Sequence, residues 1–115
     1  MLSTTARQPN HALAVSNGLR PGLALVAKSM ADEFGPGGIR VNGLLPGSIE
    51  TERIHELLAT ADDPAEARRV AQSSIPLGRY GTPAEFGAVA AFLLSPAAGF
   101  VTGTMLAVDG GISRS

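Results

Sequence analysis

Two short apolar runs, at residues 39–45 and 103–108, set the strongest limit on what this chain can fold into. The first, IRVNGLL, is typical of a strand buried on both faces, which implies a parallel sheet. The second, GTMLAV, predicts the last strand. The stretch between the two runs is helical, so the simplest packing is a strand–helix–strand unit with a right-handed crossover. Because a two-stranded sheet is marginal by itself, the pattern predicts an α/β fold in which further strands are missing.

A helix is predicted before the first strand. Five apolar residues recur at helical spacing over residues 19–34, which predicts an amphipathic helix that covers the sheet: Leu19, Leu23, Val26, Met30 and Phe34. GPGG at 35–38 ends this helix, because glycine accepts the left-handed backbone found at helix ends. Pro21 fits if it lies in the first turn, where its missing N–H costs little.

Three further helices are predicted between the strands. Residues 50–75 carry two short patterns, and Asp63-Pro64-Ala65-Glu66 begins the second with a capping residue and an acid three positions later. Thr82-Pro83-Ala84-Glu85 repeats that signature. The helix that follows places Phe86, Val89, Ala90 and Leu93 on one face, and Pro96 ends it.

Composition narrows the class of protein. The chain has 115 residues, enough for one domain or a part of one, and 17% are charged where an average domain has about 25%. The net charge of -1 and the absence of a basic run argue against a nucleic-acid partner. No apolar run approaches the roughly 20 residues of a membrane span, and the first residues lack a signal-peptide pattern. We therefore expect a soluble cytoplasmic protein without disulfides, since cysteine is absent.

Four motifs, in order and in register, resemble the C-terminal half of the short-chain dehydrogenase/reductase family. They are GIRVN at 38–42, PGSIET at 46–51, PLGRYGTPAEFGAVAAFLLS at 76–95 and TGTMLAVDGG at 102–111. The resemblance implies that residues 1–115 are the C-terminal segment of a single doubly wound, parallel-sheet (Rossmann-like) domain, with two strands and about four helices. The two predicted strands are similar to the sixth and seventh strands of that fold.

The resemblance implies a nicotinamide site after the first predicted strand. In open α/β sheets, ligands bind beyond the carboxyl ends of the strands. In the family, the matching segment holds the carboxamide of NAD or NADP, which implies that Pro46, Gly47, Ile49 and Thr51 bind the cofactor. The alternative is a plain turn that ends the strand.

The catalytic positions depart from the family pattern. The register implies Ser3, Ser16 and Arg20 where the family has Ser, Tyr and Lys, and some members carry a similar SNxxR stretch. Arg20 keeps a positive charge that could hold ribose hydroxyls, although arginine is not equivalent to lysine. Ser3 could polarise a substrate carbonyl, or it is an ordinary terminal residue. Ser16 is a far weaker acid than tyrosine, and its alternative role is a helix N-cap.

Three other residues with reactive side chains attract attention. Tyr80 could replace the missing acid, but it lies in the GRYGTP turn, where a packing role is favoured. His11 and His55 are far apart without metal-ligand spacing, so surface positions and no metal site are predicted.

We expect that residues 1–115 lack the N-terminal, nucleotide-binding half of the family fold. No G-x-x-x-G-x-G phosphate loop occurs in the sequence. We therefore expect an NAD(P)-dependent oxidoreductase segment that is inactive alone and acts on a small carbonyl or alcohol substrate only if completed. The alternative is a non-enzymatic module that forms a homo-oligomer or docks onto related full-length subunits. Such association is expected because the first strand has an open edge.

Overall fold

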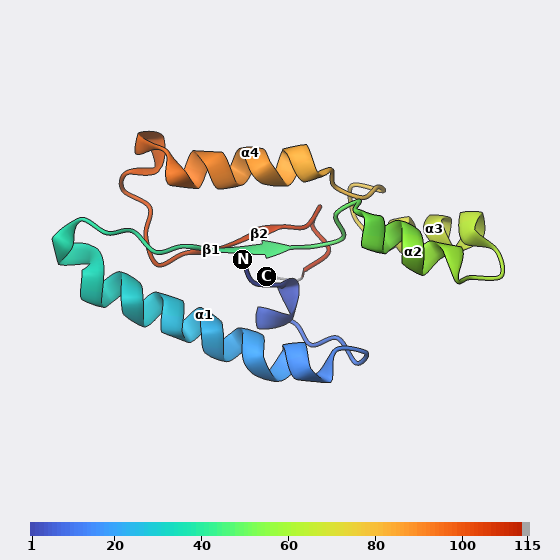
Figure 1. The fold of residues 1–115 in the computed structure, drawn as a ribbon, viewed down its shortest axis with the longest axis horizontal. Coiled ribbons are helices and arrows are strands. Elements are labelled where there is room, and N and C mark those ends of the chain that lie inside the picture. The colour runs from blue at the N-terminus through green and yellow to red at the C-terminus, as the bar shows by residue number, and fades with distance from the viewer. Residues whose placement is uncertain (114–115) are drawn as a thin grey trace.

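The computed structural model describes residues 1–113 as two helical layers around a small sheet (Figure 1). The order of the helices and strands is α1 (Ala14–Phe34), β1 (Gly43–Pro46), α2 (Glu52–Ala59), α3 (Pro64–Ser73), α4 (Pro83–Leu94) and β2 (Met105–Val108). Three short 3₁₀ helices join them: η1 (Thr4–Ala6), η2 (Gly35–Gly37) and η3 (Pro96–Ala98). In Figure 1, α1 and α4 lie on opposite sides of the strands, and the α2–α3 hairpin projects from one end.

β1 and β2 form the predicted parallel pair, with Gly43 opposite Met105 and Pro46 opposite Val108. Both strands are shorter than the sequence predicted, because side chains make much of the bonding before β1, although the Gly103 N–H still donates to the Val41 carbonyl over 2.8 Å. The Val41 N–H donates to the Thr102 hydroxyl over 3.1 Å, and the Asn42 amide donates to the Val101 carbonyl over 2.9 Å. The stretch 39–42 is therefore joined to the approach to β2 without being part of the sheet.

α1 begins earlier than predicted, and Pro21 lies inside it. The expectation that Pro21 occupies the first turn is wrong. The helix entrance is held by Asn17, which accepts a hydrogen bond from the Asn10 N–H over 3.0 Å and donates to the Asn10 carbonyl over 2.7 Å. This pair anchors the preceding loop, so the chain forms helix well before the proline.

The predicted apolar stripe of α1 does not face the sheet. Leu19, Leu23, Val26, Met30 and Phe34 are all exposed. The residues turned toward the interior are small, and Ala31 is the buried one among them. The helix packs mainly against η1 and η2 instead of the strands, and the face that carries Ala24, Ala27 and Ala31 is the more buried one, so the larger apolar side chains lie on another face.

The signals at the starts of α3 and α4 are confirmed. Asp63 caps α3 by accepting from the Glu66 N–H over 3.0 Å. Thr82 and Glu85 form a capping box at the start of α4, and Leu93 on its predicted inner face is buried. α4 ends at Leu94, and Pro96 begins η3.

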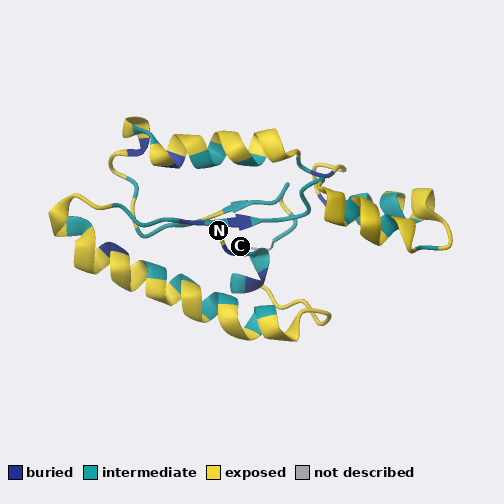
Figure 2. Ribbon diagram, in the orientation of Figure 1, coloured by how far each residue is buried: buried dark blue, intermediate teal, exposed yellow. Residues whose placement is uncertain are grey.

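The core is small for a chain of this length. Among the described residues, Leu45 in β1 is the largest fully buried side chain, and most of α1 and of the α2–α3 hairpin is exposed (Figure 2). The radius of gyration is 15.9 Å, whereas a compact chain of this length has about 13 Å. The accessible surface is 7513 Å², about 1,600 Å² more than a typical monomer of this mass exposes. The fold therefore leaves surface that a compact domain covers.

Candidate functional site: two clusters at the carboxyl end of β1

The three positions implied as catalytic gather around the N-terminal segment. Ser3 is the N-cap of η1, where its hydroxyl accepts a hydrogen bond from the Thr5 N–H over 3.3 Å. The Thr5 hydroxyl lies 2.7 Å from the Ser16 hydroxyl on α1, and either oxygen can be the donor. Arg20, one turn further along α1, donates to the Met1 carbonyl over 3.4 Å. Ser3 and Ser16 thus share Thr5 as a hydrogen-bond partner, and Arg20 is bound to the same N-terminal segment.

Ser16 is not a helix N-cap. Leu13 occupies that position and Ser16 lies in the first turn of α1, so the capping role considered for Ser16 is wrong. Its hydroxyl instead faces Thr5, a buried residue with 5% of its surface exposed. Thr5 is the member of the cluster that the sequence did not single out, because only the η1 turn brings it opposite α1.

The N-terminal segment runs along β1. The Leu2 N–H donates to the Leu44 carbonyl over 2.8 Å, and η1 contacts β1. Ser3, directly after Leu2, is therefore at the same part of the sheet as the segment that leaves β1. This juxtaposition joins the implied catalytic positions to the implied nicotinamide segment.

The segment after β1 is held by backbone bonds to its neighbours. The Gly47 N–H donates to the Val108 carbonyl over 3.1 Å, which extends the ladder beyond the strands. Further on, the Glu50 N–H donates to the Gly81 carbonyl over 2.7 Å, and the Gly81 N–H donates to the Ser48 carbonyl over 3.0 Å. Pro46 and Ile49 therefore lie in a segment that is bonded to Val108 on one side and to Gly81 on the other, and they are not part of a free loop.

Gly47 has a structural reason to be glycine. A Cβ atom at this position would lie 2.6 Å from both the Cα and the Cβ of Asp109. No side chain fits at that distance, so the turns after β1 and β2 can approach each other this closely only at a glycine. The packing of the two turns therefore requires glycine at position 47.

Thr51 has a hydroxyl that the helix does not use. It is the N-cap of α2, yet its side chain makes no capping hydrogen bond, and the residue is exposed. Threonine at an N-cap normally accepts from an N–H in the first turn. The hydroxyl is therefore open to another hydrogen-bonding group, as the carboxamide role requires.

A small pocket of about 120 Å³ lies beyond the carboxyl ends of the strands, lined by residues that include Ser48, Ile49 and Asp109. Burial raises the pKa of Asp109, but hydrogen bonds from Ser113 and from the Gly111 N–H outweigh this effect and lower the pKa below its usual value. The carboxylate is engaged in the turn after β2, where it accepts from the Gly111 N–H over 2.9 Å and from the Ser113 N–H over 3.1 Å. Asp109 thus shapes the pocket wall.

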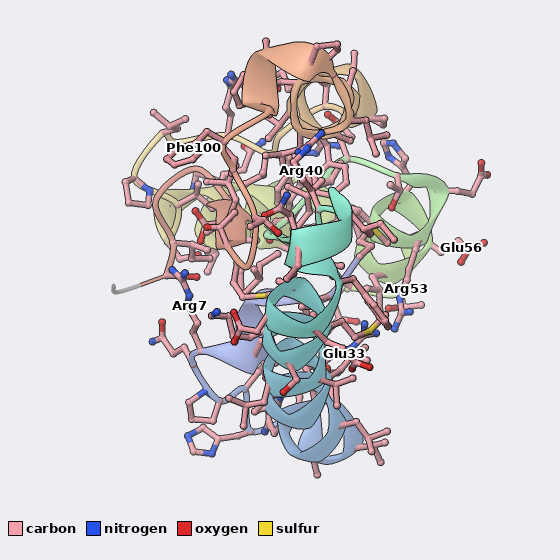
Figure 3. The ribbon with its side chains drawn as sticks, turned by 90° about the vertical axis from the view of Figure 1, so that its left-hand side faces the viewer. Arg7, Glu33, Arg40, Arg53, Glu56 and Phe100 are labelled. Atoms are coloured by element: carbon pink, nitrogen blue, oxygen red, sulfur yellow. The ribbon has the colours of Figure 1, made fainter. Side chains whose placement is uncertain are left out.

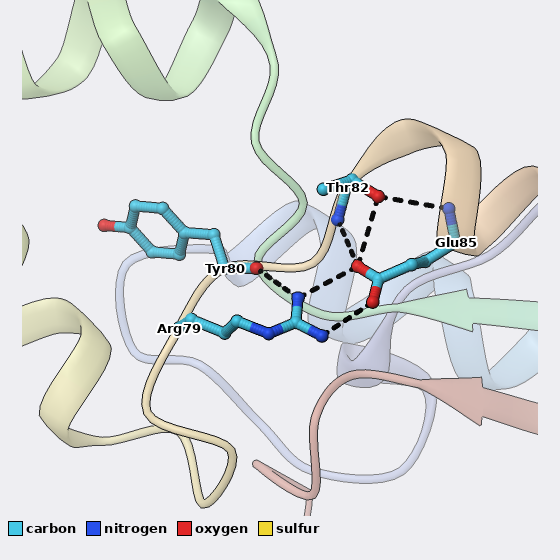
Figure 4. Close-up of polar contacts among 4 residues, drawn as sticks. All are labelled: Arg79, Tyr80, Thr82 and Glu85. Carbon is cyan, nitrogen blue, oxygen red and sulfur yellow. Dashed lines mark hydrogen bonds and ion pairs between the residues drawn. The ribbon is translucent and has the colours of Figure 1, made fainter.

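A polar network beside this pocket stiffens the start of α4 (Figure 4). Arg79 donates to both carboxylate oxygens of Glu85, over 2.9 and 2.6 Å, and to the Tyr80 carbonyl over 3.1 Å. The hydrogen bond from Arg79, followed by those from Thr82, lowers the pKa of Glu85 to about 2. The polar groups of these residues are hydrogen-bonded to one another, so we assign the network a structural role.

Tyr80 and the two histidines have no part in the clusters. Tyr80 is 5% exposed and packs under the Arg68 guanidinium, whose carbon lies 5.3 Å from the ring centre, so the packing role is confirmed. Arg68 also donates to Glu50 over 2.6 Å, and this hydrogen bond lowers the pKa of Glu50. His11 is exposed, and His55 lies 3.8 Å from Glu50. Residues 1–113 contain no cluster of three or more His, Cys, Asp or Glu side chains that could hold a metal ion.

The helix-flanked parallel pair and the similarity to solved structures define the chain as part of a Rossmann-like α/β protein. A sequence profile described as enoyl-(acyl carrier protein) reductase matches residues 1–113. The chain belongs to the short-chain dehydrogenase/reductase family. None of the helices in the described part is long and apolar enough to cross a membrane.

Two relatives illustrate the sequence similarity. The chain is 46% identical over 90 residues to an inactive 2-(S)-hydroxypropyl-CoM dehydrogenase 2 of Xanthobacter autotrophicus, which covers 76% of this chain and 38% of the relative. It is 42% identical over 94 residues to a 3beta-hydroxysteroid dehydrogenase 1 of Eggerthella lenta, covering 82% of this chain and 34% of the relative. The chain thus spans well under half the length of these relatives.

Solved structures share the fold closely. YwfH, an NADPH-dependent reductase involved in bacilysin biosynthesis, superposes with a TM-score of 0.92 at 29% identity. The match covers 99% of this chain and 45% of the YwfH chain. An NADPH-bound short chain oxidoreductase of Pseudomonas aeruginosa, described as containing an atypical catalytic center, has a TM-score of 0.88 at 36% identity. That match covers 99% of this chain and 44% of the oxidoreductase.

Proposed function

We propose that this chain is the C-terminal segment of an NAD(P)-dependent oxidoreductase, with no cofactor binding or turnover of its own. It provides the nicotinamide side of the site and the catalytic positions, and a small carbonyl or alcohol compound is the substrate class once the fold is complete. The observation that carries this proposal is the juxtaposition at β1, where Leu2 bonds to Leu44 and brings Ser3 toward the segment 46–51.

The residues present fit one half of the cofactor. The Thr51 hydroxyl, unused in capping α2, and the backbone of Pro46, Gly47 and Ile49 would hold the carboxamide, and Arg20 would hold ribose hydroxyls. The nicotinamide supplies or accepts the hydride when it is bound. The other half of the cofactor lacks a site, because the sequence contains no glycine-rich phosphate loop. The choice between NAD and NADP stays open, although two relatives with similar folds are described with NADPH.

The hydroxyl cluster replaces the usual acid. The Ser16 hydroxyl donates to or accepts from the Thr5 hydroxyl, so the proton donor at this position is a part-buried pair of hydroxyls instead of a phenol. An efficient general acid has a pKa near the working pH, and the pKa of a serine hydroxyl lies far above it. Serine is therefore a weak general acid at neutral pH. Ser3 would polarise a substrate oxygen by hydrogen bonding. The Ser3 hydroxyl already accepts one hydrogen bond, from the Thr5 N–H, so its O–H remains the group that could donate to the substrate.

Cofactor titration tests the proposal directly. The fluorescence of NADPH and of NADH is followed as the purified chain is added, with the complete Pseudomonas aeruginosa oxidoreductase as the positive control. We expect saturable binding by the control and none by the chain at micromolar concentrations. Saturable micromolar binding by the chain alone would overturn the proposal that the missing half is required.

A second candidate function is an interaction module that self-associates through α1. The exposed stripe of Leu19, Leu23, Val26, Met30 and Phe34 forms one continuous apolar face, and soluble monomers rarely leave such a face bare. The excess surface of about 1,600 Å² exceeds the roughly 800 Å² that one partner buries in an ordinary interface. We propose a second copy of the chain as the occupant, because one helix face can pair with itself about a two-fold axis.

Light scattering coupled to size exclusion tests this association. We expect a dimer for the wild type and a monomer for Leu23→Glu, since a charge at the centre of the stripe cannot be buried without a partner. Ser29→Glu is the matched control, because Ser29 is exposed on the same helix but lies outside the stripe. A monomeric wild type, or equal dimers in both variants, would refute the stripe as the interface.

A further inference from the structure

Thr5 carries an inference beyond the positions that the family pattern implies. It is a buried threonine of the η1 turn, with 5% of its surface exposed. Its backbone N–H donates to the Ser3 hydroxyl over 3.3 Å, and its own hydroxyl lies 2.7 Å from the Ser16 hydroxyl. One buried residue is therefore bonded to both serines, and the direction of each bond decides whether the serine keeps its own proton for another partner.

The direction of the bond to Ser3 is fixed by the backbone. An N–H group can only donate, so the Ser3 oxygen is the acceptor, as expected of an N-cap residue that satisfies a donor at the start of a helix. A hydroxyl has one proton and two lone pairs, so it can accept this bond and still donate its own proton. Ser3 is half-buried, and its O–H is left to donate to a group outside the turn.

The direction of the bond to Ser16 follows from burial. If Ser16 donated, the Thr5 proton would need a second acceptor, and within residues 1–113 Ser16 is the only hydrogen-bond partner of the Thr5 hydroxyl. A buried donor without an acceptor costs its full desolvation penalty. Ser16 is half-buried, so its proton can reach solvent or a ligand instead. The arrangement of lower free energy therefore has Thr5 donating and Ser16 accepting.

The helix backbone does not hold the Ser16 proton either. Four other hydroxyls at helix ends donate to the carbonyl three residues earlier, over 2.7–2.8 Å: those of Thr60, Ser73, Ser74 and Ser95. In the part of the chain that the structure describes, Ser16 makes no such bond, although it lies on α1. Its O–H is therefore left for a partner outside the fold, like that of Ser3.

The two O–H groups are donors without an acceptor of their own. A cation lies on the same segment, because Arg20 donates to the Met1 carbonyl over 3.4 Å. Fixed donors beside a positive charge favour an oxygen that carries negative charge, and they stabilise further charge that develops on it. A carbonyl oxygen is an acceptor of this kind.

We propose that Thr5 is a positioning residue, which donates its N–H to Ser3 and its O–H to Ser16 and so leaves both serine O–H groups as donors to one oxygen atom of a carbonyl compound. Thr5 acts through the serines and does not contact the ligand. The inference rests on the proposed function for the substrate class, whereas the direction of the two hydrogen bonds is measurable without cofactor or turnover.

Nuclear magnetic resonance of the full chain measures which hydroxyl donates. The chain is isotopically labelled at the Cβ atoms of serine and threonine and dissolved in an equal mixture of light and heavy water. A hydroxyl proton held in a buried hydrogen bond exchanges slowly and splits the Cβ signal of its residue, whereas a proton that exchanges with solvent gives one averaged signal. We expect a split signal for Thr5 and single signals for Ser3 and Ser16. A split signal from either serine, or a single signal from Thr5, overturns the inference.

Variants separate the positioning role from a structural one. Thr5→Val keeps the branched shape and removes the hydroxyl, Thr5→Ser keeps the hydroxyl, and Thr60→Val at the end of α2 is the matched control. We expect the Ser16 Cβ signal to shift in Thr5→Val, to return to its wild-type position in Thr5→Ser, and to stay in place in Thr60→Val. An unchanged Ser16 signal in Thr5→Val, or an equal shift in the control, overturns the inference. If Thr5→Val does not fold, the exchange pattern of the wild type decides.

Dimethyl sulfoxide tests the acceptor, because it offers one oxygen with partial negative charge and no proton. We expect it to move the Ser3 and Ser16 signals with a common midpoint in the wild type and in Thr5→Ser. Binding to Thr5→Val should be about tenfold weaker, because a Ser16 hydroxyl that is not held can rotate away. Ser73 is the internal control, since its hydroxyl donates to the Val70 carbonyl over 2.7 Å.

Each outcome of this titration is decisive. Equal movement of the Ser73 signal, no movement of the Ser3 and Ser16 signals, or equal binding by Thr5→Val overturns the inference. The titration with NADPH and NADH tests the proposed function separately, because neither the exchange pattern nor the sulfoxide titration involves the cofactor.

Discussion

Arg40 offers the sharpest test of how this small fold is held together. Its guanidinium donates to the Leu93 carbonyl over 2.7 Å, to Val101 over 3.2 Å and to Ser95 over 3.3 Å. These carbonyls belong to the end of α4 and to the loop that leads to β2. In Figure 3 Arg40 lies below the orange ribbon at the top of the view, whereas Glu56 lies at the periphery. A cation at this place satisfies carbonyls that the helix end leaves unpaired and also complements its dipole.

The expected cost of Arg40→Met follows from those three bonds. A hydrogen bond to a charged group contributes about 1.5–3 kcal/mol when it is well made and shielded. Here one bond is short, two are long and the side chain is half-buried, so we expect a local loss of about 2–4 kcal/mol. Methionine keeps most of the apolar stem, which separates the loss of the bonds from a loss of packing.

Hydrogen exchange followed by mass spectrometry measures this loss locally. The reporters are the Gly103 N–H, which donates to Val41, and the Val101 N–H, which donates to Ala98. Because exchange reports the free energy of local opening, 2–4 kcal/mol corresponds to about 30- to 700-fold faster exchange. The matched control is Arg53→Met on exposed α2, which should leave both reporters unchanged. If Arg40→Met also leaves them unchanged, the guanidinium does not hold the loop and the reasoning is refuted.

Two more predictions concern the pH dependence of helix stability and the packing of the turns after β1 and β2. The pKa of Glu85 is lowered to about 2 from an ordinary 4.5, so its stabilising effect is complete above about pH 4.5 and is lost as the pH falls toward 2. We therefore expect the helical circular dichroism signal to fall further in the wild type than in Glu85→Gln over this range. An equal or smaller fall in the wild type would contradict the prediction. Gly47→Ala should destabilise the chain by about 1–3 kcal/mol, because its Cβ overlaps Asp109. Gly87→Ala, with nothing within 4 Å, should be neutral or stabilising; a similar shift of the urea midpoint in both variants would show that the turns can separate freely.

Local chemistry made several elements predictable from the sequence. Asp63 and Thr82 begin α3 and α4 because an N-cap oxygen satisfies an N–H only three residues away, an interaction that needs no distant partner. The parallel pairing of β1 and β2 followed from the helical stretch between them. The inner face of α4 followed from the spacing of Phe86, Val89, Ala90 and Leu93, since that period is set by the helix itself.

Interactions between distant segments explain the expectations that were wrong. The start of β1 depends on Asn42 and Val41 bonding to residues about sixty positions away, and no local pattern contains that information. Pro21 lies inside α1 because the pairing of Asn10 with Asn17 begins the helix earlier. The apolar stripe of α1 was assigned to the sheet, yet the helix packs through its alanines, because the side of a helix that faces a sheet is decided by the fit of both surfaces.

The sequence by itself determined which residue types occupy the implied site positions, since the order of motifs along the chain sets Ser3, Ser16, Arg20 and the segment 46–51. Only the tertiary structure decided what those residues touch. The backbone bond between Leu2 and Leu44 sets the N-terminal segment beside β1, the η1 turn places Thr5 against Ser16, and the close approach of two turns requires Gly47. Each of these depends on distances of a few ångströms between segments that are far apart in the chain, and such distances are set by packing.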